Sequence, residues 1–208
     1  MLKKGRLFIL SGPSGCGKDT ILKEVLTADP RVKLSISTIT RAMREGEREG
    51  EKYHFISRGE FERLLAQNAF LEYNEYLGNY YGTPKKPIEN WLADGYDVLL
   101  EIDVNGAQKV RSLLPQTPSI FILPPSMAVL RERLSGRGTE TAEVVKRRLA
   151  EAAREISQAG VYDYLVVNDE LETAVGDILA ILRAHKCTNQ EMGEFMKEVQ
   201  KDAESRNW

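Results

Sequence analysis

The sequence predicts an α/β fold in which a parallel sheet is covered by helices on both faces. Three observations indicate it: short apolar runs, helical segments that alternate with them, and a glycine-rich turn that joins the first run to the first helix. Such alternation is typical of parallel sheets, because neighbouring parallel strands need a helix-sized connection. The first run, Leu7-Phe8-Ile9-Leu10, is apolar at every position, so we expect a strand buried on both faces.

The remaining core elements follow from the same two periodicities. We predict the first helix over 19–28, where Ile21, Leu22 and Val25 share one face and Pro30 lies beyond the end. Short apolar runs predict the later core strands, at 97–103, 119–123 and 164–167.

The pattern changes between residues 33 and 93. Period-two segments predict an inserted lobe with a small sheet of its own, at 33–37, 53–56 and 70–76. Apolar residues recur at helical spacing within 60–67, and we expect a helix there to cover that sheet.

Two further helical patterns, 126–134 and 141–156, flank a loop with the sequence Gly136-Arg137-Gly138, where we expect a mobile flap. The whole chain, 1–208, is therefore expected to form a single domain made of several parts. They are the core (5–32, 94–125 and 160–185), the inserted lobe (33–93), the flap or lid (126–159) and a helical tail (186–208).

Composition excludes several classes of protein. The 208 residues are 42% apolar, which is enough for a buried core and too much for a disordered chain. The 29 basic and 31 acidic residues nearly cancel, so no overall field attracts nucleic acid or an anionic membrane, and no apolar run could cross a bilayer. Cys16 and Cys187 lie far apart and form no metal motif, which indicates reduced thiols. We expect a cytoplasmic monomer or homodimer without nucleic-acid or membrane partners.

A phosphate-binding loop is predicted at the first strand-to-helix turn. There Gly12-Pro13-Ser14-Gly15-Cys16-Gly17-Lys18 fits the P-loop pattern GxxxxGK. The glycines let the backbone aim successive N–H groups at phosphate oxygens, beside the positive end of a helix. Lys18 supplies a charge for the terminal phosphates. We include the next two residues, Asp19 and Thr20, in this nucleotide site.

Asp19 departs from the P-loop pattern, which has Ser or Thr at this position as a ligand of Mg²⁺. A carboxylate could meet the ion through water. Alternatively, the nucleotide and other side chains could hold the ion, because Mg²⁺ keeps several of its waters in proteins. The sequence leaves both arrangements open.

Segments of the inserted lobe resemble one known family. They are Ser35-Ile36-Ser37-Thr38-Ile39-Thr40-Arg41-Ala42-Met43-Arg44-Glu45-Gly46-Glu47, Phe70-Leu71-Glu72-Tyr73 and Gly78-Asn79-Tyr80-Tyr81-Gly82-Thr83. The first fits the guanylate kinase pattern S-x-S-x-T-T-R-x-x-R-x-G-E, except that Ile39 replaces the first paired Thr. From residue 5 to about 185 the chain resembles the guanylate kinase family, which implies the fold of a P-loop nucleoside monophosphate kinase.

The resemblance implies that the lobe binds the phosphate of GMP. Arg41 and Arg44 would grip it together with Tyr53 and Tyr81. Guanidinium forks and phenol hydroxyls suit a phosphate, because both donate hydrogen bonds to its oxygens.

The guanine base would be recognised by other residues of the same lobe. Glu72 would accept hydrogen bonds from N1–H and the exocyclic amine of guanine, a pair of donors that adenine lacks. Ser37 and Thr83 would address the carbonyl edge of guanine, and Glu101 would assist on the GMP side. A site of this kind should reject AMP, because a buried carboxylate without partners is costly.

The family's other substrate and cofactor are ATP and Mg²⁺. Asp103, at the end of a predicted strand, would orient Mg²⁺ through water, and Asn168 would reach the adenine region of ATP. Phosphoryl transfer depends on aligning two anions and stabilising the charge of the moving group. The implied catalytic cations are Lys18, Arg41, Arg44, Arg137 and Arg148, of which the last two would close from the lid.

The activity that the resemblance implies is transfer of the γ-phosphoryl group of ATP to GMP, and to dGMP, giving ADP and GDP in purine nucleotide metabolism. Two alternatives stay open. A non-catalytic guanylate-kinase-like module that binds protein partners would typically lack an intact phosphate loop, whereas Lys18 and its glycines are present here. A P-loop kinase acting on a sugar phosphate would not need Glu72, Tyr81 and Thr83 arranged for guanine.

Overall fold

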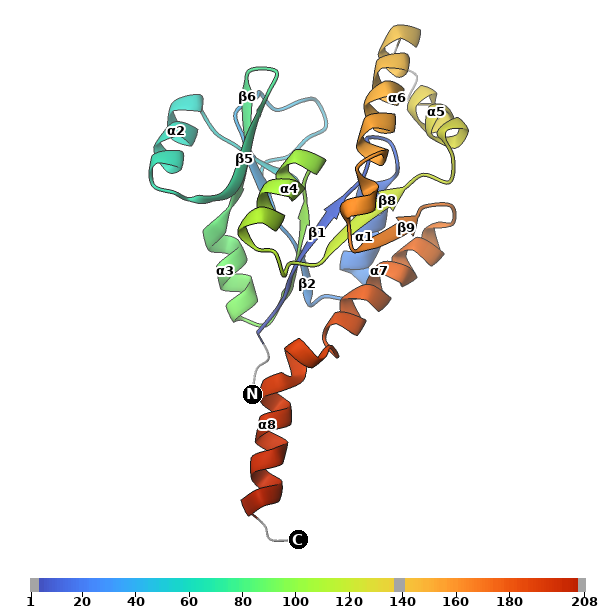
Figure 1. Cartoon of the computed structure of the whole chain (residues 1–208). Coiled ribbons are helices and arrows are strands. Elements are labelled where there is room, and N and C mark those ends of the chain that lie inside the picture. Colours follow the sequence, from blue (N-terminus) through green and yellow to red (C-terminus); the bar gives the residue numbers. More distant parts are fainter. Residues whose placement is uncertain (1–3, 137–140, 206–208) are drawn as a thin grey trace.

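The larger of two β-sheets forms the centre of the molecule (Figure 1). The computed structural model describes residues 4–136 and 141–205. The larger sheet has five strands, all parallel, in the order β2-β7-β1-β8-β9. Its strands are β1 (Leu7–Ser11), β2 (Val32–Leu34), β7 (Asp97–Glu101), β8 (Ser119–Leu123) and β9 (Tyr164–Val167). The predicted α/β class with a parallel sheet is confirmed.

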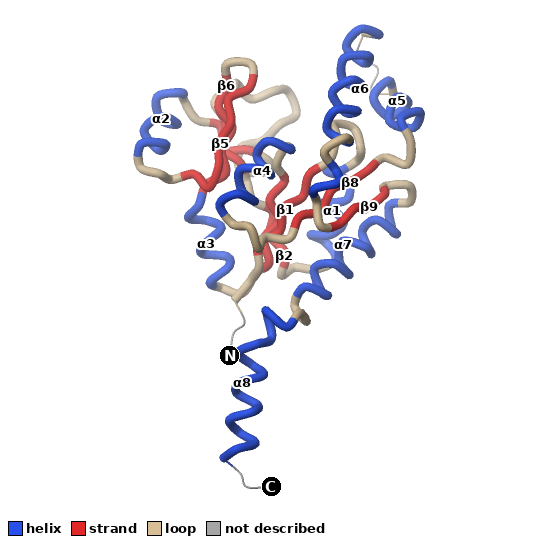
Figure 2. The backbone as a smooth tube through the Cα atoms, in the orientation of Figure 1, coloured by secondary structure: helices blue, strands red, loops and turns tan. Residues whose placement is uncertain are grey.

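Both faces of this sheet are covered by helices (Figure 2). Successive strand residues point to opposite faces, so Phe8 and Leu10 pack against α1 (Lys18–Ala28) and α7 (Leu171–His185). Ile9 points the other way, toward α3 (Lys85–Ala93) and α4 (Val104–Leu113). Two buried faces explain why the strand is apolar at each of these positions.

The smaller sheet forms the lobe. Its strands are β3 (Ser37–Ile39), β4 (Tyr53–Phe55), β5 (Phe70–Tyr76) and β6 (Asn79–Pro84), in the order β4-β3-β6-β5. Helix α2 (Arg58–Ala66) covers this sheet, and its fully buried Phe61 stacks on Phe70 and Tyr80 with ring centroids 4.3 and 5.0 Å apart. A Cβ atom at Gly82 would lie 2.8 Å from both phenylalanine rings, so glycine there makes room for the stack.

The boundaries predicted for the lobe, 33–93, are wider than the segment that forms the smaller sheet and its helix. The segment predicted as one strand, 33–37, contributes to two strands, because β2 pairs with β7 of the large sheet whereas β3 pairs with β4 and β6. At the other end, α3 packs against the core sheet through Ile88. The lobe therefore runs from β3 to β6.

The predicted lid is a pair of helices, α5 (Met127–Ser135) and α6 (Ala142–Ile156). Leu130 and Leu134 of α5 pack on Val145 of α6 in a small apolar cluster of their own. Residue Arg137, predicted to act from this region, lies outside the described residues. A short helix, η1 (Ala159–Val161), connects α6 to β9.

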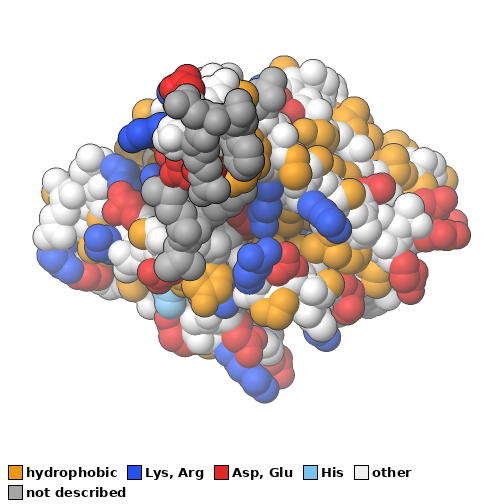
Figure 3. Space-filling model, turned by 90° about the horizontal axis from the view of Figure 1, so that it is seen from below, with side chains coloured by type: hydrophobic (Ala, Val, Ile, Leu, Met, Phe, Trp, Pro, Cys, Tyr) orange, Lys and Arg blue, Asp and Glu red, His pale blue; other side chains and the backbone are white. Residues whose placement is uncertain are grey.

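The tail forms α8 (Asn189–Ser205), which extends away from the body of the molecule (Figure 1). Near its start, Glu191 forms an ion pair of 2.8 Å with Arg6. Seen from below, basic and acidic side chains are interspersed on this face of the molecule (Figure 3). Among the described residues, no helix combines the length and apolar character needed to span a membrane.

The stack around Phe61 predicts a large effect on stability. Phe61→Ala should lower the free energy of unfolding by about 3–5 kcal/mol, because a fully buried ring is removed and a cavity remains. Urea unfolding followed by circular dichroism measures this loss. The control Tyr76→Ala removes a ring of the same lobe that is 63% exposed, and it should cost less than about 1 kcal/mol. Equal losses would contradict the role of Phe61 as the core of the lobe.

Candidate active site

A cavity of about 370 Å³ lies between the phosphate loop, the lobe and the carboxyl ends of the core strands. This is where open α/β sheets bind ligands, and the volume falls in the range of small-molecule sites. Most of the predicted site residues line it: Gly12, Ser14, Gly15, Gly17, Lys18, Asp19, Thr20, Ser37, Tyr53, Glu72, Tyr81, Glu101 and Asp103. Other lining residues were not predicted: Leu34, Ser35, Lys52, Asn74, Gly82, Ile102 and Glu155.

The phosphate loop has the backbone conformation expected of an anion-binding nest. Gly15 and Gly17 have φ values of 86° and 96°, in the left-handed region that favours glycine. The loop leads into the N-terminus of α1, whose free N–H groups carry a positive potential. The Lys18 ammonium donates to the carbonyl oxygens of Gly12 (2.6 Å) and Pro13 (3.1 Å), so it lies over the loop.

Side chains from distant parts of the chain donate hydrogen bonds to the backbone of this loop. The side-chain amide of Asn168, 6% exposed, donates to the carbonyl oxygen of Cys16 at 2.7 Å. Arg133 of α5 donates to the same carbonyl (3.3 Å) and to that of Asn168 (2.9 Å). Asn168 is not among the residues that line the cavity, and its predicted contact with the adenine of ATP stays a prediction.

Helix α6 also contacts the loop directly. Arg148 of α6 donates to the Ser14 hydroxyl at 2.7 Å, which brings one of the predicted lid cations to the phosphate loop. Arg133 was not singled out from the sequence. Several arginines share its helical pattern, and nothing local distinguishes the one that reaches the loop.

A buried pair, Glu72 and Thr83, lies at the lobe side of the cavity. The Thr83 hydroxyl donates to Glu72 Oε1 at 2.6 Å. Thr83 is 1% exposed and Glu72 is 9% exposed. Burial raises the pKa of the Glu72 carboxyl, against the opposing effect of the Thr83 hydrogen bond. Thr83 does not itself line the cavity, so its contact orients Glu72. The start of α4 closes over the pair, since a Cβ atom at Gly106 would lie 3.2 Å from Glu72 Oε2.

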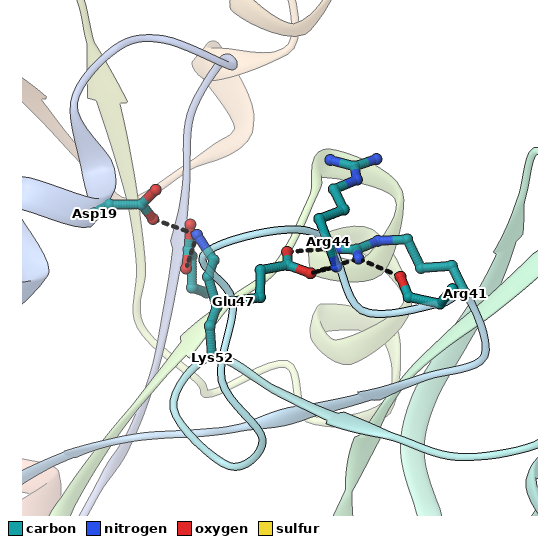
Figure 4. Close-up of polar contacts among 7 residues, drawn as sticks. Asp19, Arg41, Arg44, Glu47 and Lys52 are labelled. Carbon is teal, nitrogen blue, oxygen red and sulfur yellow. Dashed lines mark hydrogen bonds and ion pairs between the residues drawn. The ribbon is translucent and has the colours of Figure 1, made fainter.

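The two arginines predicted to hold phosphate lie on the loop between β3 and β4 (Figure 4). The Arg41 guanidinium carbon lies 5.4 Å from the centroid of the Tyr53 ring. Arg41 forms a two-point ion pair with Glu47, at 2.7 and 2.6 Å. The Arg41 guanidinium and the Arg44 backbone N–H lower the pKa of Glu47 to about 2. The side chain of Arg44 is exposed and extends away from this pair (Figure 4). Glu47 belongs to the family pattern, but its contact with Arg41 was not predicted.

Lys52 is a further residue that the sequence analysis missed. Its ammonium contacts the Asp19 carboxylate and lies 3.5 Å from a carboxylate oxygen of Glu101. It thereby connects the lobe to the first turn of α1 (Figure 4) and, through Glu101, to the end of β7. Its place in the sequence, between Glu51 and Tyr53, gave no sign of these distant partners.

The acidic residues of the cavity suit a cation that is held mainly by phosphates and water. Within the described residues, no group of three or more His, Cys, Asp and Glu side chains could hold a metal ion by itself. Asp103 uses one carboxylate oxygen to cap α4, accepting from the Gly106 N–H at 2.7 Å, and it also lines the cavity. These features fit Mg²⁺, which commonly binds through one or two carboxylates, several waters and substrate phosphates.

Comparisons with known proteins agree with this geometry. The family model described as Guanylate kinase matches residues 4–185. The chain belongs to the guanylate kinase family. It is 52% identical to a guanylate kinase of Neisseria gonorrhoeae over 88% of this chain and 89% of that protein. A guanylate kinase of Carboxydothermus hydrogenoformans is 49% identical, over 89% and 91% of the two chains. The crystal structure of guanylate kinase from Anaplasma phagocytophilum is 39% identical, with a TM-score of 0.74 over 90% of each chain.

In this member of the guanylate kinase family, the phosphate loop contains a cysteine. Cys16 is fully buried, and burial raises the pKa of its thiol, against a smaller opposing effect of the Lys18 charge. The thiol therefore stays protonated at neutral pH and is a poor nucleophile. Although it lies in the loop, Cys16 does not line the cavity, and neither does Pro13.

The burial of Cys16 predicts which thiol reacts. At neutral pH a disulfide reagent such as DTNB should modify Cys187, which is exposed, and leave Cys16 unmodified until the protein is unfolded. The released thiolate, measured by absorbance, should correspond to one cysteine in the native chain and to both in denaturant. Cys187→Ser is the control, and it should remove the native reaction. A fast reaction in this variant would show that Cys16 is accessible.

Proposed function

We propose that this chain transfers the γ-phosphoryl group of ATP to GMP, and to dGMP, giving ADP and GDP. The observation that carries the proposal is that one cavity joins a phosphate loop to the buried Glu72–Thr83 pair. Its relatives in Neisseria gonorrhoeae and Carboxydothermus hydrogenoformans are named guanylate kinases, and the similarity extends over most of the chain.

ATP would be the ligand of the phosphate loop. The N–H groups of the loop and the N-terminus of α1 would bind phosphate oxygens, and the Lys18 ammonium would turn to the β and γ phosphates. Bound Mg²⁺ would neutralise part of the phosphate charge, with Asp103 holding its waters. Thr20 and Asp19 line the same part of the cavity.

GMP would occupy the lobe side. An ionised Glu72 would accept from two N–H groups of guanine, and Thr83 would hold the carboxylate in place. Ser37 lines the cavity and would address the guanine carbonyl. The GMP phosphate would lie near Tyr53 and Tyr81, within reach of the arginines that precede β4.

Phosphoryl transfer would then depend on alignment and on charge. Phosphates bound at the two ends of one cavity face each other, which removes much of the entropic barrier to transfer. Arg148 already reaches the loop, and closure of the lid would exclude water from the transfer point. The cations that we propose for this step are Lys18, Arg41, Arg44, Arg137 and Arg148.

The alternatives fit the site less well. A module that only binds protein partners has no need of a phosphate loop braced by Asn168 and Arg133. A sugar phosphate has no pair of N–H donors for the buried Glu72 carboxylate, which would keep the Thr83 hydroxyl as a donor but gain none from the ligand. The near balance of charges supports the absence of nucleic-acid and membrane partners. The proposal also includes a cytoplasmic monomer or homodimer.

A coupled assay of ADP release, with GMP, dGMP, AMP, UMP and ribose 5-phosphate as acceptors, tests the activity. We expect efficient turnover with GMP and dGMP only. Glu72→Gln should raise the KM for GMP about 10- to 100-fold, because a hydrogen bond to a charged group is lost. Lys18→Ala should abolish turnover with every acceptor. Comparable rates with AMP and GMP would refute the proposed pocket.

The pH dependence of GMP binding tests the state of Glu72. Burial raises the pKa of this carboxyl, and only the ionised form accepts from both guanine donors. As the pH falls through the raised pKa, the KM for GMP should increase, while the KM for ATP should change little. Steady-state kinetics across the acid range measures both constants. In Glu72→Gln the increase should disappear, and its persistence would assign it to another group.

A further inference from the structure

Lys52 lines the cavity, and its side chain points toward Asp19 (Figure 4). It precedes β4 in the lobe, yet its ammonium contacts Asp19 in the first turn of α1. It also lies 3.5 Å from Glu101, whose side chain is only 15% exposed. The ammonium thus bridges two carboxylates that come from different elements of the core.

The wall of this cavity is acidic for a site that would take two phosphorylated ligands. Among the described residues that line it, the basic side chains are Lys18 and Lys52. Its acidic side chains are more numerous: Asp19, Glu72, Glu101, Asp103 and Glu155. Carboxylates repel phosphates, and the repulsion is strong in a cavity that excludes part of the solvent. Phosphate binding therefore requires that some of these charges be neutralised.

Asp19 is the carboxylate for which this requirement is greatest. It directly follows Lys18 and occupies the first turn of α1, the end whose positive potential would receive phosphate. An unpaired carboxylate there would offset that potential. P-loops commonly place an uncharged hydroxyl at this position, so this chain needs a counter-charge that the pattern does not provide.

We propose that Lys52 is a positioning residue that neutralises Asp19 and Glu101, and so allows the phosphate loop of this chain to bind ATP with a carboxylate in its first helical turn. The inference rests on the proposed function and extends it, because a residue of the acceptor lobe becomes a determinant of affinity for the donor nucleotide.

The charge state of Lys52 supports this role. Burial lowers the pKa of its ammonium, but Glu101 and Asp19 together outweigh burial and raise the pKa above its ordinary value. Lys52 is therefore a cation throughout the neutral range. Its side chain is 40% exposed and that of Asp19 is 66% exposed, and ion pairs of this exposure contribute little to folding stability. Loss of Lys52 should thus affect anion binding far more than the melting temperature.

The test measures the Kd of ADP by calorimetry in the presence of EDTA, so that no metal ion masks the charge of Asp19. Lys52→Met should weaken ADP binding about tenfold, which corresponds to about 1.4 kcal/mol. The double variant Lys52→Met with Asp19→Asn should regain an affinity within about twofold of the unmodified chain, since the repelling charge is also removed. Lys52→Arg should retain the affinity, because it keeps the charge.

Two controls separate charge from structure. Lys85→Met removes a lysine at the start of α3, directly after the lobe, that donates to Asn68 at 2.8 Å and does not line the cavity, and it should leave ADP binding unchanged. In 1 M salt the penalty of Lys52→Met should shrink, because the Debye length falls to about 3 Å. Thermal unfolding of each variant verifies that the fold is intact.

The inference is overturned if Lys52→Met binds ADP as tightly as the unmodified chain, or if Asp19→Asn does not restore the affinity in the double variant. If the unmodified chain fails to bind ADP both in EDTA and with Mg²⁺ present, the proposed function fails and the inference fails with it. The result for the unmodified chain therefore distinguishes the two failures.

Discussion

The hydrogen bond from the Asn168 amide to the Cys16 carbonyl orients the phosphate loop, and the geometry of the donor site depends on it. The C=O and N–H of a trans peptide point in opposite directions. Because the Cys16 carbonyl points back to Asn168, the N–H of Gly17 must point away from it. Arg133 of α5 also donates to this carbonyl. A side chain at Gly17 could not be accommodated, because its Cβ atom would lie 2.2 Å from the Asn168 amide nitrogen.

On the acceptor side, too, residues from separate parts of the chain position one site residue. Glu72 belongs to β5 of the lobe, but the surface that buries it includes the first turn of α4, which is a core helix. Lys109 of α4 also donates to the backbone carbonyl of Tyr73, the next residue along β5. The lobe and the core are therefore joined at the point where the base would be recognised. A shift of the lobe would alter the burial, and hence the ionisation, of its carboxylate.

Local patterns accounted for much of this structure. The continuous apolar runs predicted β8 and β9 with their observed bounds, and alternation did the same for β5. Alternation could not separate β2 from β3, because a period-two segment looks the same whichever sheet it joins. The strand β6 was not predicted, since its segment includes Gly82 and Pro84, residues that are uncommon in strands.

The site residues also fall into two groups, those that sequence motifs predicted and those that only the fold brings to the site. Lys18, Glu72 and Tyr81 were found through motifs, and the structure brings them to one cavity. The partners that position such residues are distant in sequence: Asn168 is 152 positions from Cys16, and Arg133 is 117. No local periodicity encodes contacts of that span. Only the order of the strands in the sheet brings these segments together.

The pairing of Arg41 with Glu47 has a consequence for the entropy of ligand capture. A long guanidinium side chain normally loses rotamer freedom when it engages an anion, at a cost of about 0.5–1.5 kcal/mol. Here two short hydrogen bonds to one carboxylate already restrict its torsions during folding. The Arg41 side chain is thus preorganised, because it loses its rotamer freedom during folding and not when an anionic ligand binds.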